Sequence, residues 1–321
     1  MPEQHEADTR GPAWLVQAAL IARRFHIEGR SKTQIADETG LSRFKVARIL
    51  DEARALGLVQ VTVRLPAQID ASLSMQVRER FGLHRAIVVA TSTTAPYEAL
   101  GRVCADLLTE VVGPEDVLGL TCSRSVASTT QALASLAPCR VVQLSGTLAG
   151  PDLDSGSVES VRRAAEVGGG RAYPIYAPMV LPDAATKTAL AGQSSIRQAV
   201  SQVDGVTVAT VAIGAWQPEL STVYSDLDVE DRSEATAAGV VGEIAARFFD
   251  AHGEPVSTKI DDRVLSVTLE QLRRIPEVIG LAHDARRATA VRAALRAHLI
   301  DSLVCDETLG RALLAGARAG G

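Results

Sequence analysis

The sequence has few aromatic residues and few cysteines, and neither kind is arranged in a functional cluster. Phe, Trp and Tyr make up 3% of the 321 residues, so the core must be built mainly from small aliphatic side chains. The six histidines are dispersed, with no His/Cys cluster of metal-ligand spacing. We therefore predict no metal and no cofactor. Four cysteines without a CxxC pair lie in apolar surroundings, which is typical of buried, reduced thiols: Cys104, Cys122, Cys139 and Cys305.

Long apolar runs are missing as well. No stretch reaches the roughly 20 residues that a membrane-spanning helix needs, and the N-terminus, MPEQHEADTRGP, does not resemble a signal peptide. No G-x-S-x-G nucleophile motif surrounds Ser123, His283 or Asp284, which argues against a hydrolase triad. We therefore expect a cytoplasmic protein that has no membrane partner and no catalytic triad.

Net positive charge is absent over the whole chain, but basic residues are concentrated near the N-terminus. The net charge is −5, whereas residues 1–64 carry 10 basic and 8 acidic side chains. Between residues 23 and 48 there are seven basic residues and three acidic ones. A local basic patch on an acidic chain is typical of a small DNA-binding module joined to a larger domain that does not bind DNA.

Residues 30–56 have the pattern of a helix-turn-helix. Ser31, with Gln34 three residues later, forms a capping box and predicts that a helix begins near residue 32. Gly40 permits a tight turn, and Ser42 can cap the next helix. An ordinary helical hairpin with solvated charges is the alternative, but the caps, the turn and the basic face agree on a DNA reader. The next helix also has an apolar stripe, which consists of Val46, Ile49, Leu50 and Ala53.

The exposed side of these helices supplies the predicted contacts with DNA. The second helix would insert into the major groove, while the first would present its N-terminus to the phosphates. Phe44 leaves two alternatives, since it can contact a thymine methyl group or pack back onto the first helix of the domain, which the sequence predicts over residues 13–28. The predicted contact residues are Arg30, Ser31, Lys32, Thr33, Ser42, Arg43, Phe44, Lys45 and Arg48.

From residue 85 onward the pattern changes to alternating strands and helices. Near-continuous apolar strands separated by amphipathic helices predict a mostly parallel, Rossmann-like α/β domain. The expected strands cover 86–90, 117–122, 140–145, 206–214, 263–268, 277–282 and 301–306. The expected helices include 97–111, 125–136, 232–249, 285–297 and 307–317.

The chain is therefore divided into four predicted parts. A disordered lead (1–12) precedes an all-α, winged helix-turn-helix domain (13–65), whose last part, 58–65, alternates like a strand. A connecting helix and linker (66–84) then lead to an α/β effector-binding domain (85–321).

Polar residues follow several of the predicted strands and define a candidate effector site. In parallel α/β sheets, ligands bind at the carboxyl ends of strands, beside helix N-termini. Hydroxyl groups and guanidinium groups at those ends suit a hydroxylated or anionic ligand. The candidate residues are Ser123, Arg124, Ser125, Gly146, Thr147, Asp226, Arg286 and Arg287.

With these features in place, the sequence from about residue 14 to 315 resembles the SorC-type family of sugar-responsive transcription regulators. The segments that carry the resemblance include QIADETGLSRFKVARILDEARALGLV, AGVVGEIAARFFDAHG and RVLSVTLEQLRRIPEVIGLA. The resemblance implies an N-terminal helix-turn-helix and a C-terminal domain similar to sugar-phosphate isomerases. It also implies a phosphorylated sugar or polyol as effector and, usually, a tetramer.

Two loops depart from the pattern of that family. Ser123-Arg124-Ser125 stands where the family usually has Gly-Arg-Thr or Gly-Gly-Thr. Ala282-His283-Asp284 replaces an Ala-Gly-Gly sequence, and Arg287 occupies the position of a family lysine. Cations and hydroxyl groups are therefore retained, while the loop glycines are replaced by side chains.

The sequence predicts a non-enzymatic, ligand-responsive regulator that binds double-stranded DNA at a palindromic operator as a dimer or tetramer. Its effector would be a sugar, a polyol or a sugar phosphate. The alternative is an isomerase-like enzyme with an appended DNA-binding module, which requires a general base. Glu243, Asp226 and Asp228 are the nearest options for that base, although none lies in a recognisable catalytic motif.

Overall fold

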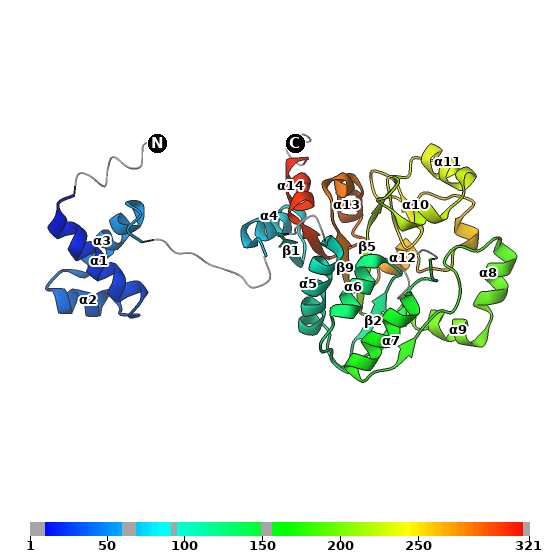
Figure 1. The fold of residues 1–321 in the computed structure, drawn as a ribbon, viewed down its shortest axis with the longest axis horizontal. Helices are drawn as coiled ribbons and strands as arrows, with labels where there is room; N and C mark the ends of the chain where they lie inside the picture. The colour runs from blue at the N-terminus through cyan, green and yellow to red at the C-terminus, as the bar shows by residue number, and fades with distance from the viewer. Residues whose placement is uncertain (1–9, 60–68, 91–94, 149–155, 317–321) are drawn as a thin grey trace. The chain divides into compact units, whose positions relative to one another are not determined.

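The computed structural model of the chain contains two compact units, Met1–Arg64 and Leu65–Gly321. It describes residues 10–59, 69–90, 95–148 and 156–316 (Figure 1). Most of the predicted lead and of the predicted strand 58–65, and part of the linker, lie outside the described residues. No helix in the described ranges is long and apolar enough to span a bilayer.

Three helices form the N-terminal unit: α1 (Pro12–His26), α2 (Lys32–Thr39) and α3 (Arg43–Ala55). The capping box of Ser31 and Gln34 is formed at the start of α2, and Gly40 ends that helix in the left-handed region with φ 67°. These short-range signals fix where the helices begin and end. The helices enclose a small core of Ala18, Ile21, Ala22, Ile35, Ala36, Val46, Ile49, Leu50 and Ala53.

A seven-stranded parallel sheet forms the centre of the second unit and confirms the predicted α/β class. Its strands run in the order β1-β10-β9-β5-β2-β3-β4. Because every pairing in this sheet is parallel, all carboxyl ends emerge at one edge, where polar loop residues gather. The strands are β1 (Arg85–Val89), β2 (Val117–Leu120), β3 (Arg140–Gln143), β4 (Ala172–Tyr173), β5 (Val208–Ala212), β9 (Glu277–Ala282) and β10 (Ser302–Asp306).

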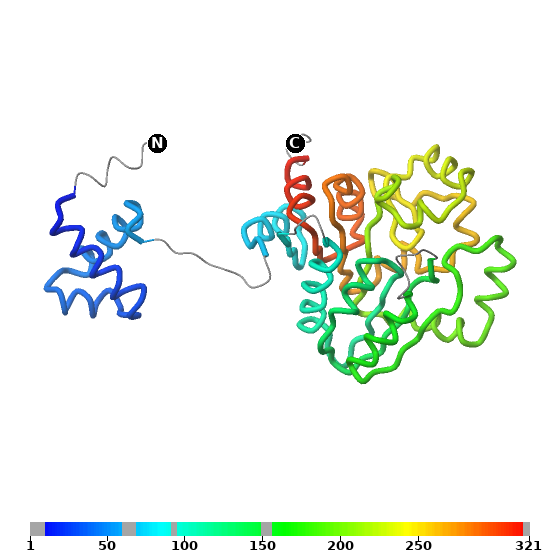
Figure 2. Tube along the Cα trace, in the orientation of Figure 1, coloured from blue at the N-terminus to red at the C-terminus, as the bar shows by residue number. Residues whose placement is uncertain are grey.

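Helices cover both faces of this sheet. Leu118 and Leu120 of β2 share a core with α5 (Pro96–Val111), α6 (Arg124–Ala132) and α7 (Ser157–Gly168). Val117 points to the opposite core, because successive side chains of a strand alternate between faces. The helices on that second face are α4 (Ala71–Phe81), α13 (Ala288–Arg296) and α14 (Glu307–Ala315). The trace in Figure 2 shows the cyan α4 beside the red α14, although they are far apart in sequence.

A smaller antiparallel sheet and several short helices complete the unit. The sheet consists of β6 (Gly214–Ala215), β7 (Gly242–Ile244) and β8 (Arg247–Phe249). The short helices are α8 (Ala184–Ala191), α9 (Ser194–Val200), α10 (Thr222–Asp226), α11 (Val229–Ala237) and α12 (Leu269–Leu272), with the 3-10 turns η4 (Val203–Gly205), η5 (Asp261–Arg263) and η6 (Ala285–Arg287).

Two predicted elements are wrong. The helix expected over 232–249 ends with α11 at Ala237, and the rest of that segment forms the β7–β8 hairpin. Gly242 permits close packing of this hairpin, since a Cβ there would lie 2.7 Å from the Phe249 ring and from the Ala290 Cβ. The strand expected over 263–268 makes only isolated bridges, with Val180 and Ser145, and joins neither sheet.

Candidate functional site

The start of α3 is organised by its cap. The Ser42 hydroxyl accepts a hydrogen bond from the Lys45 backbone N–H at 3.2 Å, which fixes the first turn and its side chains. Phe44 is 88% exposed, so it does not pack back onto α1. Arg43, Lys45 and Arg48 are exposed beside it on the same helix. The start of α3 therefore presents an unpacked aromatic ring among three cations.

Some predicted DNA contacts already have acidic partners within the N-terminal unit. Arg30 lies 3.4 Å from Glu38, and Arg48 lies 3.6 Å from Glu52. Within the described ranges, no ion pair involves Arg43. The remaining predicted contacts, Ser31, Lys32 and Thr33, lie at the start of α2.

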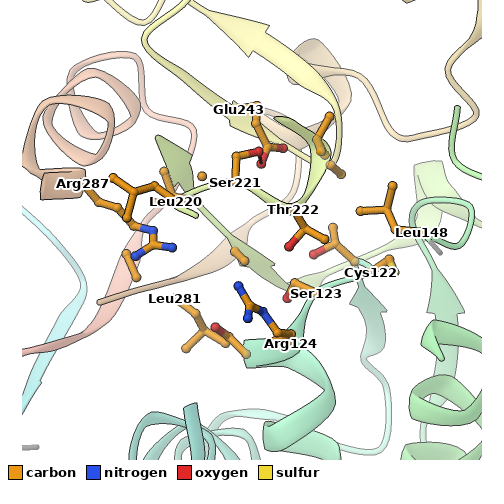
Figure 3. A pocket seen from close by; sticks show the side chains of 18 of the residues that line it. Cys122, Ser123, Arg124, Leu148, Leu220, Ser221, Thr222, Glu243, Leu281 and Arg287 are labelled. Atoms are coloured by element: carbon orange, nitrogen blue, oxygen red, sulfur yellow. Dashed lines mark hydrogen bonds between the residues drawn. The ribbon is translucent and has the colours of Figure 1, made fainter. Parts of the chain in front are cut away.

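In the second unit, a pocket lies at the carboxyl edge of the parallel sheet (Figure 3). The loops after β2, β5 and β9 form its floor, and β7 with the start of α10 forms another wall. This is the position expected for a ligand in a parallel α/β fold. The polar lining residues are Tyr97, Thr121, Ser123, Arg124, Ser125, Ser221, Thr222, Glu243, His283 and Arg287.

Two guanidinium groups face the pocket from different elements, as Figure 3 shows for Arg124 and Arg287. Arg124 opens α6 and lies over the Tyr97 ring, 4.7 Å from its centroid. Arg287 is 6% exposed, and its Nη1 donates to the His283 carbonyl oxygen at 2.7 Å. Burial lowers the pKa of Arg287, which still remains a cation because an arginine titrates far above neutral pH. The pocket is therefore suited to an anionic group.

Hydroxyl and carboxyl groups also line the pocket. Glu243 is buried, and its Oε1 accepts a hydrogen bond from the Ser221 hydroxyl at 2.9 Å. Its Oε2 accepts from the Ala246 backbone N–H at 3.1 Å. Burial raises the pKa of Glu243 despite these hydrogen bonds and the nearby Arg287 charge. Such groups can bind the hydroxyl groups of a ligand.

The pocket contains half of the predicted effector residues. Ser123, Arg124, Ser125 and Arg287 line it. The hydroxyl of Ser123 also caps α6 by accepting from the Val126 backbone N–H at 3.1 Å. The strand-end argument therefore identified the β2 loop and one of the two adjacent arginines.

The other four predicted residues are not among those that line the pocket. The backbone of Gly146 and Thr147 packs against the backbone at Pro178. Thr147 forms an isolated bridge with Pro178, and a Cβ at Gly146 would lie 2.4 Å from the Pro178 oxygen. Asp226 ends α10, and partial burial raises its pKa. Arg286 is exposed and pairs with Asp284.

Several pocket residues were not predicted to bind the effector. Tyr97 lies at the start of α5, and Ser221 with Thr222 lies at the start of α10, several residues beyond the ends of β1 and β6. A Ser-Thr sequence at the start of a short helix predicts a helix cap and does not predict a ligand site. Ser221 forms such a cap, because its hydroxyl accepts a hydrogen bond from the Tyr224 backbone N–H. Among the described residues, no group of three His, Cys, Asp or Glu side chains is placed to hold a metal ion.

Comparison with known proteins identifies the family. The family model described as "Putative sugar-binding domain" matches residues 66–315. The transcriptional regulator LsrR of Enterobacter sp. (strain 638) is 29% identical over 94% of this chain and 94% of its own. The uncharacterized transcriptional regulator YjhU of Escherichia coli (strain K12) is 30% identical over 91% of this chain and 92% of its own.

The fold is similar to that of a solved regulator. The full-length sorbitol operon regulator SorC from Klebsiella pneumoniae gives a TM-score of 0.71 at 24% identity, over 94% of this chain and 99% of that one. The fold, the matched domain and the named relatives agree with one another. The chain belongs to the SorC-type family of sugar-binding transcriptional regulators.

Proposed function

We propose that this protein is a sequence-specific DNA-binding transcription regulator of a carbohydrate or polyol pathway, and that a small effector in the sheet-edge pocket controls it. The observation that carries the proposal is the lining of that pocket. Arg124 and Arg287 contribute cations to this lining, and Ser221 and Glu243 contribute a hydroxyl and a carboxyl group. This combination is complementary to a sugar, polyol or sugar phosphate, because hydroxyl groups and an anionic group both find partners.

The DNA-binding half of the proposal assigns α2 and α3 as a helix-turn-helix, with α3 as the recognition helix. Arg43 and Phe44 at its start would contact base edges, and Arg48 one turn later would add a cation. The start of α2, with Arg30, would lie against phosphates. The relatives are named as transcriptional regulators, which supports this assignment.

The domain limits and the assembly follow from the same proposal. The DNA-binding domain would occupy 13–65, and residues 66–84 would connect it to the effector domain 85–321. The helix α4 of this connecting segment packs on the core of the second unit. A dimer or tetramer would place paired recognition helices on a palindromic operator. Effector binding would change DNA affinity only through a difference in its affinity for two states of the assembly. Such a regulator would act in the cytoplasm, where bacterial DNA is found.

The direct test measures DNA binding by fluorescence anisotropy of labelled fragments from the region upstream of its own gene. We expect sequence-selective binding that weakens steeply as salt rises, because counterions are released from phosphates. Arg43→Ala should weaken binding about 10-fold, the usual scale for a lost base contact. Arg54→Ala, which removes the same charge from an exposed position in the last turn of α3, is the matched control. Equal affinity for unrelated DNA would exclude a sequence-specific regulator.

The alternative function is an isomerase-like enzyme. Of the three acidic residues considered as a general base, only Glu243 lines the pocket, whereas Asp226 ends α10 and Asp228 caps α11. Both oxygens of Glu243 already accept hydrogen bonds from the protein, which favours a binding role over proton abstraction. Turnover of pentose or aminohexose phosphates that is lost in Glu243→Gln would establish the enzyme instead.

A further inference from the structure

His283 contains a buried nitrogen without a protein partner. Its Nε2 atom is shielded from solvent, and it has no hydrogen-bond partner among the residues that the structure describes. A buried polar atom of this kind reduces stability, because its lost hydration is not replaced. His283 lines the pocket, so a ligand that displaces the side chains shielding Nε2 can become the partner of this atom.

A purely structural role does not account for the imidazole. The ring packs edge-on against the titratable phenol ring of Tyr97, with the centroids 4.6 Å apart and the planes at 90°. A phenyl ring at position 283 would make the same contact without burying an unpaired nitrogen. Packing alone therefore does not require the Nε2 atom of His283, whereas binding of a ligand would use it.

The charges around His283 are positive on the pocket side. Burial is the largest cause that lowers the pKa of His283, to about 4, and Arg287 and Arg124 lower it further. Asp306 and Asp284 raise it, but both carboxylates already accept hydrogen bonds from other groups. With an empty pocket, the imidazole is therefore neutral at neutral pH.

We propose that His283 is a specificity-determining residue of the effector pocket, where its Nε2 donates a hydrogen bond to an oxyanion of the effector held by Arg124 and Arg287. This inference rests on the proposed effector pocket and names the side chain that selects an anionic effector. The pocket supplies two permanent cations and one group that can become a third.

Binding of the oxyanion should then be coupled to uptake of a proton. The bound negative charge offsets the repulsion between the two guanidinium groups and a protonated imidazole, so the pKa of His283 rises towards its ordinary value. By linkage, the ligand binds more tightly as the pH falls, because the complex holds more protons than the empty pocket. The affinity should increase about 10-fold from about pH 7.5 to about pH 5.5 if the pKa of the complex reaches its ordinary value of roughly 6.5.

The test uses the full chain and sulfate, an oxyanion whose own charge does not change over this pH range. The dissociation constant of sulfate is measured by calorimetry at each pH, and the histidine ring resonances are followed by NMR. We expect one of the six histidines to shift saturably, and His283→Gln to remove that resonance. His283→Gln should weaken sulfate binding about 10-fold at the lower pH and abolish the pH dependence.

His252→Gln is the matched control, because His252 is exposed in the turn after β8. His283→Asn serves as a second variant if the glutamine variant does not fold. Equal sulfate affinity in the wild-type and His283 variants would overturn the proposal, and so would a saturable shift confined to another histidine or no saturable shift at all. None of these outcomes would contradict the proposed regulator, whose DNA binding is measured independently in the same samples.

Discussion

The carboxylate of Asp284 is held by the guanidinium of Arg286, with Oδ2 2.9 Å from Nε and 2.7 Å from Nη2. This pair turns Arg286 towards solvent, where it is also 3.9 Å from Glu219. The next residue, Arg287, is buried and lines the pocket. Two adjacent arginines that the sequence predicts for the same effector site therefore lie in different surroundings.

The separation of these arginines predicts a difference between two variants. Arg287→Gln removes a buried cation from the pocket, and sulfate affinity should fall at least about 10-fold, the scale of a lost charge-assisted hydrogen bond. Arg286→Gln changes the net charge by the same amount at an exposed position, and affinity should stay within about twofold. Calorimetry with sulfate measures both, and circular dichroism checks the folding of each variant. Equal losses in the two variants would contradict the assignment of Arg287 alone.

Phe44 predicts a loss of DNA binding without a loss of stability. Because its side chain is 88% exposed, Phe44→Ala should change the free energy of unfolding by less than about 0.5 kcal/mol. DNA affinity should nevertheless fall about 5-fold or more if the ring contacts a base methyl group. Val46→Ala is the contrasting variant, since Val46 is fully buried in the same helix and its truncation should destabilise the unit by about 1–3 kcal/mol. Thermal unfolding and DNA anisotropy separate the two effects.

How much the sequence predicts depends on the range of the interactions that decide each feature. The α2–α3 turn depends on Ser31, Gly40 and Ser42, which act within a few residues, so its helix limits are predicted closely. The β7–β8 hairpin packs closely at Gly242 against Ala290, some fifty residues away. A contact of this range is not visible in the local pattern, from which a helix is predicted. Short apolar runs alone do not distinguish these outcomes.

The candidate pocket shows the same division. Ser123 and Arg287 follow strands of the parallel sheet, so a strand-end rule identifies them. Tyr97 and Ser221 lie several residues beyond the strand ends, at the starts of α5 and α10, and no local pattern shows that these positions reach the pocket. Gly146 follows a strand too, but the backbone of Pro178 occupies the space beside it.

Gly146 predicts a loss of stability from a single methyl group. A Cβ at this position would lie 2.4 Å from the Pro178 oxygen and 2.6 Å from the Met179 nitrogen, both of which are backbone atoms that cannot move aside easily. Gly146→Ala should therefore destabilise the second unit by about 1–3 kcal/mol. Gly205→Ala is the control, because the added Cβ would have no heavy atom of a described residue within 4 Å apart from its own chain neighbours. Chemical denaturation measures both, and an unchanged midpoint in Gly146→Ala would contradict the close packing.

Ser42 predicts a cost for losing the cap of α3. Ser42→Ala removes the acceptor for the Lys45 N–H, which should cost about 1 kcal/mol. Ser42→Asn supplies another good acceptor at the N-cap and should retain most of the stability. Thermal unfolding of the three proteins measures the effect. Equal destabilisation by alanine and asparagine would show that the hydroxyl contributes something other than the cap.

His283 predicts a particular dependence of stability on pH. Its pKa in the folded protein is about 4, below the ordinary value of 6.5, so the unfolded chain binds the proton more readily. The contribution of the neutral imidazole is therefore fully present above pH 6.5 and is lost as the pH falls towards 4. His283→Gln should reduce the fall in melting temperature between pH 6.5 and pH 4. His252→Gln, at an exposed position, should leave the dependence of the melting temperature on pH as it is in the wild type. Differential scanning calorimetry at closely spaced pH values tests this, and parallel curves for wild type and His283→Gln would show that His283 does not titrate as its burial requires.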